Sequence, residues 1–297
     1  MVNWSIGELD SKPIKLVFSV PINFRLHSEM NKEYRKELLS ASIEACIKAG
    51  KEILDVYQSD DFNVQLKSDD SPLTIADQRA HNAIVSVLDQ FEIPILSEEG
   101  THLPYNERKD WKECWIVDPL DGTKEFIKRN DEFTVNVALV IEGKAVAGVI
   151  YVPVYKQLYF ADELLGAFRC DDITENKQLE DLISDSKQLP LEQVRRGIRV
   201  VGSRSHMNEE TRLFIESLRD NGDDVEMVTK GSSLKLCLIA EGSADVYPRY
   251  APTMEWDIAA GHAIVSASGA VVKQLGSEDD LEYNKANLLN PYFICKR

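Results

Sequence analysis

The sequence predicts an α/β protein whose N-terminal part is of the α+β kind. Two observations support this: two segments of helical periodicity precede paired strands, and beyond residue 197 short strands alternate with helices. Such alternation is typical of an α/β layer. At 297 residues the chain is long enough for two domains, and its length favours two.

The elements before the centre of the chain follow from periodicity and capping. Apolar residues recur every three or four positions over residues 31–57, which indicates a helix with one buried face. Thr74 with Asp77 three positions later resembles a capping box and predicts a second helix start. The predicted elements are a helix over 31–57, a strand over 64–67, a helix over 74–91 and a strand over 93–97.

The central stretch, residues 115–123, begins as an apolar run rich in β-branched and aromatic residues. Such a run predicts a buried strand. Asp118 and Asp121 follow on a turn that contains Pro119 and Gly122. Carboxylates at the end of a buried strand, followed by the amides of a turn, predict a cation site beside a phosphate site.

The rest of the chain divides at a charged, weakly periodic segment, residues 171–196, which we interpret as a surface excursion. The predicted domains are 30–170 and 197–297, with residues 1–29 as an arm or an extension upstream of Met30. The later elements are strands at 134–141, 145–152, 159–161, 166–169, 198–201, 225–228 and 244–247, and helices at 208–219, 233–240 and 257–268.

Charge and cysteine content restrict the possible functions. The net charge of −16 disfavours binding to nucleic acid polymers or anionic membranes. No apolar run approaches the roughly 18 residues of a membrane-spanning helix. The five cysteines are scattered and form no C-x-x-C pair, which favours buried thiols in a reducing compartment and hence a cytoplasmic protein.

Carboxylates gather at four places along the chain. Taken alone, Asp69 fits a turn before a proline, Glu98 fits a surface pair, and Asp257 fits a helix cap. Together with Asp118 and Asp121 they form a set of oxygen donors without nearby His or Cys, which suits Mg²⁺ better than Zn²⁺. Such a set predicts a two-metal phosphoryl-transfer site.

Three stretches, residues 97–99, 118–123 and 255–261, resemble the motifs of the lithium-sensitive, Mg²⁺-dependent phosphatases of the inositol monophosphatase superfamily. The similarity extends over residues 31–297. It implies a five-layered αβαβα sandwich of the inositol monophosphatase and fructose-1,6-bisphosphatase type. It also implies a site between an N-terminal metal-binding domain and a C-terminal substrate-specificity domain, with two or three Mg²⁺ ions.

The resemblance also implies a role for individual residues. Asp69 and Thr123, with Glu98 nearby, match the residues that orient the nucleophilic water. The amides of Gly122 and Thr123 match phosphate donors at a short helix start. The positions that match metal ligands are Glu98, Asp118, the backbone carbonyl of Leu120, Asp121 and Asp257.

Within the superfamily, residues 67–74, 202–206, 231–235 and 247–249 are more similar to the 3′(2′),5′-bisphosphate nucleotidase branch. A substrate with two phosphates needs donors beyond the metal ions, and an arginine at position 249 fits a phosphate, where inositol phosphatases typically place an acid. For His206 a loop or capping role is an equal alternative. The candidate substrate-binding residues of the second domain are Ser203, Ser205, His206, Ser232, Lys235 and Arg249.

The resemblance implies Mg²⁺-dependent hydrolysis of the 3′-phosphate of adenosine 3′,5′-bisphosphate (PAP) to AMP, and of the sulfated form PAPS to APS, in sulfur assimilation. One alternative is an inositol monophosphatase or broad sugar-phosphate phosphatase. Another is a non-catalytic nucleotide- or metal-binding regulator. A monomer or homodimer is expected, and the resemblance leaves open a peripheral place at the cytoplasmic face of the inner membrane.

Overall fold

The computed structural model describes residues 22–59, 65–66, 72–101, 103–175, 177–191, 197–202 and 208–297, with the backbone alone for 22–31, 65–66 and 72–73. Helix α1 begins at Ile22, within the predicted arm or extension over residues 1–29. Residues 1–21 lie outside the described ranges.

Helices account for three of the layers in the fold. The predicted capping box is confirmed, since the Thr74 amide donates to Asp77 Oδ2 (2.7 Å) and the Ala76 amide to Thr74 Oγ1 (3.1 Å). The helices are α1 (Ile22–Tyr57), α2 (Ile75–Leu88), the 3₁₀ helix η1 (Asp89–Phe91), α3 (Tyr105–Arg108), α4 (Thr123–Ile127), α5 (Leu179–Asp185), α6 (Glu209–Asp220), α7 (Leu234–Glu241) and α8 (Glu255–Ala267).

A seven-stranded sheet forms the larger of the two main sheets, in the order β3-β4-β5-β6-β7-β8-β9. Only the pairing of β3 with β4 is parallel, and each other neighbouring pair is antiparallel. Its strands are β3 (Ile95–Ser97), β4 (Glu113–Asp121), β5 (Thr134–Ile141), β6 (Lys144–Val152), β7 (Gln157–Asp162), β8 (Gly166–Cys170) and β9 (Lys187–Gln188). The two-residue strands β1 (Gln65–Leu66) and β2 (Pro72–Leu73) pair separately.

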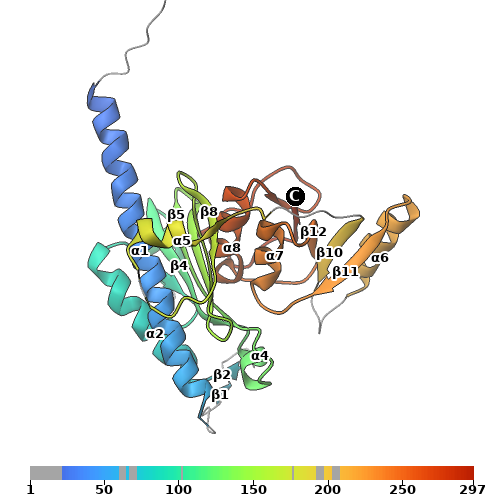
Figure 1. Cartoon of the computed structure of the whole chain (residues 1–297), viewed down its shortest axis with the longest axis horizontal. Helices are drawn as coiled ribbons and strands as arrows, with labels where there is room; N and C mark the ends of the chain where they lie inside the picture. The colour runs from blue at the N-terminus through green and yellow to red at the C-terminus, as the bar shows by residue number, and fades with distance from the viewer. Residues whose placement is uncertain are drawn as a thin grey trace, which may run out of the picture.

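The seven-stranded sheet is buried on both faces, which explains why β4 is almost continuously apolar. Trp115 and Val117 pack with α1 and α2 on one face, whereas Cys114 and Ile116 pack with α7 and α8 on the other. Successive side chains of a strand point to opposite faces, so one run of apolar residues serves two cores. Figure 1 shows the two helix pairs on either side of this sheet.

A five-stranded sheet lies beyond α7 and α8, in the order β11-β10-β12-β14-β13. Helix α6 packs against its outer side (Figure 1). The layers therefore run helix, sheet, helix, sheet, helix, and the predicted αβαβα sandwich is confirmed. The strands of the five-stranded sheet are β10 (Ile198–Gly202), β11 (Val225–Thr229), β12 (Val246–Arg249), β13 (Val271–Gln274) and β14 (Phe293–Lys296).

The segment 171–196 differs from the predicted surface excursion. It contains α5, whose Leu179 and Leu182 are buried in the core, and β9, which extends the seven-stranded sheet. Because only a few apolar residues anchor it among many charged ones, its periodicity is weak in the sequence. The sequence analysis also missed the antiparallel strands β13 and β14.

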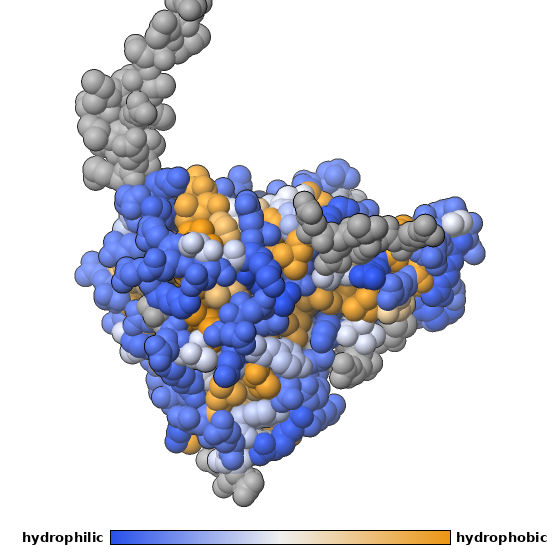
Figure 2. All heavy atoms as spheres, viewed as in Figure 1, coloured by the Kyte–Doolittle hydropathy of each residue, from blue (hydrophilic) through white to orange (hydrophobic). Residues whose placement is uncertain are grey.

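The cysteines are buried and the visible surface is mostly hydrophilic, as the composition predicts. All five cysteines are buried and unpaired. Hydrophilic residues dominate the face shown in Figure 2, where apolar residues gather in smaller areas. Within the described ranges, none of the helices has the length and apolar character that crossing a bilayer requires.

Candidate active site

Parallel pairing of β3 with β4 brings the first two acids together. Ser97 lies opposite Val117 in the register, and the Glu98 amide donates to the Val117 carbonyl (3.0 Å). Glu98 therefore follows the end of β3 beside Asp118, which is 1% exposed. Carboxyl ends of adjacent parallel strands meet at one edge of a sheet, so this meeting follows from the topology.

An irregularity in β4 separates Asp118 from Asp121. The register with β5 shifts between these two residues, and the Leu120 amide turns back to donate to Asp118 Oδ1 (3.1 Å). Gly122 follows with φ +93°, a conformation that glycine adopts at low cost, and α4 begins at Thr123. The turn thus holds Asp118, the Leu120 carbonyl and Asp121 close together.

Asp257 reaches the same place from far along the chain. It lies in the first turn of α8, which packs on β4, β5 and β6. One carboxylate oxygen from each of Glu98, Asp118 and Asp257 lies within 4.8 Å of the other two. The structure therefore brings together three of the four predicted carboxylate ligands as a cluster.

Asp121, the fourth predicted carboxylate, is held from the second half of the chain. Its Oδ2 accepts hydrogen bonds from Ser232 Oγ (2.7 Å) and Ser233 Oγ (2.6 Å). Ser233 Oγ also lies 3.1 Å from the Asp257 carbonyl and accepts from Asn136 Nδ2 (2.8 Å). The hydroxyl of Ser232, which was predicted as a substrate contact, thus donates to a carboxylate that was predicted as a metal ligand.

Thr123 has a partner that the sequence analysis assigned only to a helix cap. Its hydroxyl lies 3.3 Å from Asp77 Oδ1 and 3.2 Å from the Leu120 carbonyl. Asp77 is 1% exposed, and its Oδ2 accepts from Thr74. One oxygen of Asp77 therefore caps α2 while the other faces Thr123.

The acids raise one another's proton affinity. The pKa of Asp118 is raised well above its ordinary value, first by burial and then by the charges of Glu98, Asp121, Asp257 and Asp77. The pKa of Asp257 is raised to about 8, first by burial and then by Asp121. Carboxylates this close cannot all remain ionised unless a cation or protons neutralise them.

The donor set fits a divalent metal ion. The clustered ligand atoms are carboxylate oxygens, which hard cations prefer. A bound cation would offset the mutual repulsion that raises the pKa of Asp118 and Asp257. The residues present therefore suit the metal that the resemblance implies.

A cavity of about 300 Å³ opens beside the acids. Asp121, Asp257, Lys235 and Arg249 all line it. Lys235 Nζ donates to the Ser232 carbonyl (2.5 Å), and burial lowers the pKa of Lys235 to about 8. The cavity thus places two cationic side chains beside the carboxylates.

The Arg249 guanidinium is only partly satisfied. Nη2 donates to the Pro252 carbonyl (3.2 Å), whereas the buried Nε has no hydrogen-bond partner among the described residues. A buried unpaired donor is costly unless a ligand satisfies it. This observation favours an anionic ligand in the cavity.

Four predicted site residues lie outside the described ranges: Asp69, Ser203, Ser205 and His206. The sequence analysis missed Asp77, Ser233 and Asn136 as members of the site. The Ser-Ser pair at the start of the predicted helix over 233–240 is a usable signal for Ser233. No sequence signal distinguishes Asp77 from an ordinary capping residue.

Comparison with known proteins agrees with this geometry. A family model described as "Inositol monophosphatase family" matches residues 34–295. A relative from Salmonella typhimurium, named 3′(2′),5′-bisphosphate nucleotidase CysQ, is 42% identical over 249 residues, which cover 82% of this chain and 94% of the relative.

Solved structures give the same result. The crystal structure of CysQ from Bacteroides thetaiotaomicron is 51% identical with a TM-score of 0.83, covering 89% of this chain and 98% of that one. The extragenic suppressor protein suhB from Bartonella henselae is 26% identical with a TM-score of 0.65, covering 86% and 92%. With a family match over most of its length and these relatives, the chain belongs to the inositol monophosphatase family.

Proposed function

We propose that this protein hydrolyses the 3′-phosphate of PAP to give AMP, and that of PAPS to give APS, with Mg²⁺ as cofactor. The observation that carries the proposal is one cavity lined both by metal-ligand acids and by Lys235 and Arg249. The names of the bisphosphate nucleotidase relatives support the same substrate class.

The acids would hold two or three Mg²⁺ ions. Glu98, Asp118 and Asp257 would share one site, to which Asp121 and the Leu120 carbonyl add further oxygens. When bound, Mg²⁺ polarises phosphoryl oxygens, favours ionisation of the attacking water and stabilises the leaving 3′ oxygen.

Thr123 and Asp77 would orient the attacking water. The single proton of the Thr123 hydroxyl points to Asp77 or to the Leu120 carbonyl, so the oxygen keeps lone pairs that can accept a hydrogen bond from water. The buried Asp77 carboxylate can take up a proton through this hydrogen bond. Asp69, predicted for the same role, remains a candidate.

Specificity would come from the second domain, residues 197–297, facing the metal-binding domain, residues 30–170. The buried Nε of Arg249 gains an acceptor when the second phosphate binds, and a guanidinium fits a phosphate by parallel hydrogen bonds. Lys235, whose pKa is lowered to about 8, would bind as a full cation once an anion lies beside it.

The test measures phosphate release from PAP and from inositol 1-phosphate by the purified protein, with Mg²⁺ and with EDTA. PAP is expected to be the better substrate, and EDTA is expected to abolish release. Arg249→Ala should lower kcat/KM for PAP about 10- to 100-fold, the effect of one charged hydrogen-bonding group, and affect inositol 1-phosphate less.

Arg219→Ala serves as the matched control, because Arg219 is exposed on α6. It is expected to leave both rates unchanged. Faster release from inositol 1-phosphate would assign the protein to the inositol monophosphatase alternative. Absence of Mg²⁺-dependent release from either substrate would support a non-catalytic regulator.

A further inference from the structure

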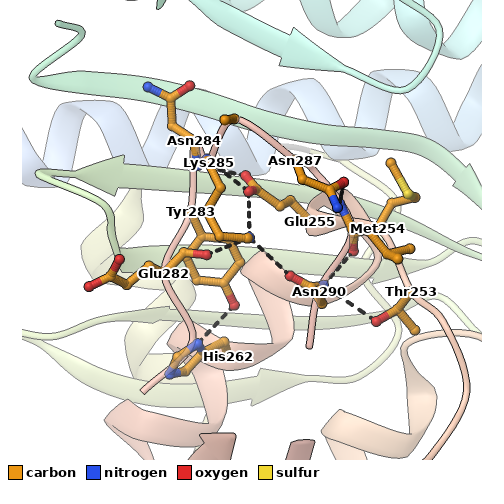
Figure 3. Close-up of polar contacts among 12 residues, drawn as sticks. Thr253, Met254, Glu255, His262, Glu282, Tyr283, Asn284, Lys285, Asn287 and Asn290 are labelled. Atoms are coloured by element: carbon orange, nitrogen blue, oxygen red, sulfur yellow. Dashed lines mark hydrogen bonds and ion pairs between the residues drawn. The ribbon is translucent and has the colours of Figure 1, made fainter. Parts of the chain in front are cut away.

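An irregular segment near the C-terminus, residues 281–290, runs along the start of α8 (Figure 3). Though it contains no helix or strand, its Leu281, Tyr283 and Asn290 are 2%, 3% and 4% exposed. We call it the strap. None of its residues belongs to the acidic cluster or lines the cavity described above.

The strap holds Glu255, an acid two residues before Asp257. Glu255 is fully buried, and its carboxylate accepts from the Asn284 amide (2.6 Å), the Lys285 amide (3.0 Å) and Lys285 Nζ (2.5 Å). Figure 3 shows Glu255 directed into the strap. Both of its oxygens are therefore occupied by protein donors, which separates its role from that of a metal ligand.

The strap also holds the peptide units just before α8. The Asn290 amide donates to the Thr253 carbonyl (2.8 Å), and Asn290 Nδ2 donates to the Met254 carbonyl (2.8 Å). The Met254 amide in turn donates to Asp257 Oδ2 (2.8 Å). The position of one carboxylate oxygen of Asp257 thus depends on peptides that the strap fixes.

The other side of the strap contacts the part of the chain that carries the remaining acids. Arg108 Nη1 donates to Asn284 Oδ1 (2.7 Å), and Asn284 Nδ2 donates back to the Arg108 carbonyl (2.8 Å). Arg108 is buried and lies in sequence between Glu98 and Asp118. The strap therefore contacts both the start of α8, which carries Asp257, and the segment between Glu98 and Asp118, the latter through reciprocal hydrogen bonds.

We propose that Glu255 and Lys285 are positioning residues that set the geometry of the metal site by fixing Asp257 relative to Glu98 and Asp118. This inference rests on the proposed function in so far as those three acids bind Mg²⁺. Hydrogen bonds that orient ligands strengthen metal binding because the ligands need less rearrangement to meet the ion. Loss of the Glu255–Lys285 contact should then weaken Mg²⁺ binding in a protein that is still folded.

The experiment measures the Tm of the full-length protein over a series of Mg²⁺ concentrations at constant ionic strength. A ligand that binds only the native state raises Tm by mass action, so the series gives an apparent Kd without using activity. Lys285→Met and Glu255→Gln are expected to raise this Kd by about tenfold or more. The conservative variant Lys285→Arg is expected to keep the wild-type affinity for Mg²⁺.

Arg297→Met is the matched control. Replacing Arg297 also removes a cation that contacts α8. Its Nη2, however, donates to Ser268 Oγ (2.6 Å), at the end of the helix opposite to Asp257. The variant should lower Tm without Mg²⁺ and leave the Mg²⁺ affinity unchanged. Asp118→Asn should remove the Mg²⁺-dependent rise in Tm.

The outcomes separate the inference from the function on which it rests. Wild-type Mg²⁺ affinity in Lys285→Met would overturn the inference. Because Lys285 is partly exposed, this variant tests the inference even if Glu255→Gln does not fold. A wild-type protein that binds Mg²⁺ but releases no phosphate would contradict the proposed function alone. A wild-type protein whose Tm does not respond to Mg²⁺ would overturn both.

Discussion

At the scale of single residues, the site depends on carboxylates whose two oxygens have different tasks. In Asp77 one oxygen caps α2 and the other faces Thr123. In Asp121 the donors Ser232, Ser233 and Asn136 all approach Oδ2, whereas Oδ1 accepts no hydrogen bond from the described part of the chain. Hydrogen bonds that occupy one oxygen fix the direction of the other.

Asp77→Asn tests whether Asp77 takes part in catalysis. The amide cannot accept a proton, so kcat should fall by about 10²- to 10⁴-fold, the usual contribution of a general base, with little change in KM. Steady-state kinetics with PAP measures this. Asp89→Asn, an exposed position after α2, serves as the control. A normal kcat for Asp77→Asn together with a loss in Asp69→Asn would return the role to Asp69.

The buried His262 should make the free energy of unfolding depend on pH. Its ring on α8 accepts or donates one hydrogen bond with Tyr283 Oη (2.8 Å), and burial, opposed by Asp280 and assisted by Lys273, lowers the pKa of His262 to about 4. A histidine in the unfolded chain titrates near pH 6.5. The stability due to neutral His262 is therefore complete above that pH and is lost as the pH falls toward 4.

Urea unfolding at pH 7 and pH 5 measures this effect. His262→Gln keeps a hydrogen-bonding group but cannot titrate, so its free energy of unfolding should fall less than that of the wild type between the two values. Parallel losses in the two proteins would show that His262 does not contribute. The comparison is made as a difference because the buried acids titrate as well.

That the acids of the site come together could be predicted from the sequence, but their hydrogen-bond partners could not. Asp118, Asp121 and Asp257 occur in short motifs whose residue types already indicate oxygen ligands. Ser232 and Asp77 have local explanations, a phosphate contact and a helix cap, that satisfy the sequence equally well. Only tertiary packing shows that their oxygens face Asp121 and Thr123.

At the scale of elements, close approach between β6 and α8 positions Asp257. A Cβ at Gly148 would lie 2.3 Å from the Ala260 carbonyl oxygen, so a side chain there would push the helix from the sheet. Small residues in both elements allow this contact. The sequence indicates that the start of α8 is rich in small residues but not which strand it meets.

Gly148→Ala should lower the free energy of unfolding by about 1–3 kcal/mol, as overpacking of a core does. It should also weaken Mg²⁺ binding, because α8 carries Asp257. Gly202→Ala is the matched control, since among the described residues a Cβ there meets only Met227 Cε, at 3.4 Å. Urea unfolding measures both variants. Equal stability of the two would contradict the account of this contact.

Elements with strong periodicity could be predicted, whereas those defined by their neighbours could not. The predicted helix at 233–240 and strand at 225–228 agree with α7 and β11 to within a residue. Strand β9 has only two residues and is held by its pairing with β8. Such a strand gains its stability from the sheet and leaves no pattern of its own.

At the scale of the whole molecule, the site exists because one layer of helices serves two sheets. Helices α7 and α8 share a core with β4 and β5 on one side and with β12 and β14 on the other. This layer carries Ser233 and Asp257 to the edge where β3 and β4 end. The order of the layers could be predicted only through the family resemblance, because periodicity does not specify how sheets stack.

We propose that Glu98, Asp118, Asp121 and Asp257 together bind the divalent cation that hydrolysis needs. The most direct measurement is the anomalous difference map of crystals grown with Mn²⁺, which takes the same oxygen ligands as Mg²⁺. We expect the strongest peak within bonding distance of Asp118, between Glu98 and Asp257. Mn²⁺ bound only elsewhere, with no peak at Asp118, would contradict the account.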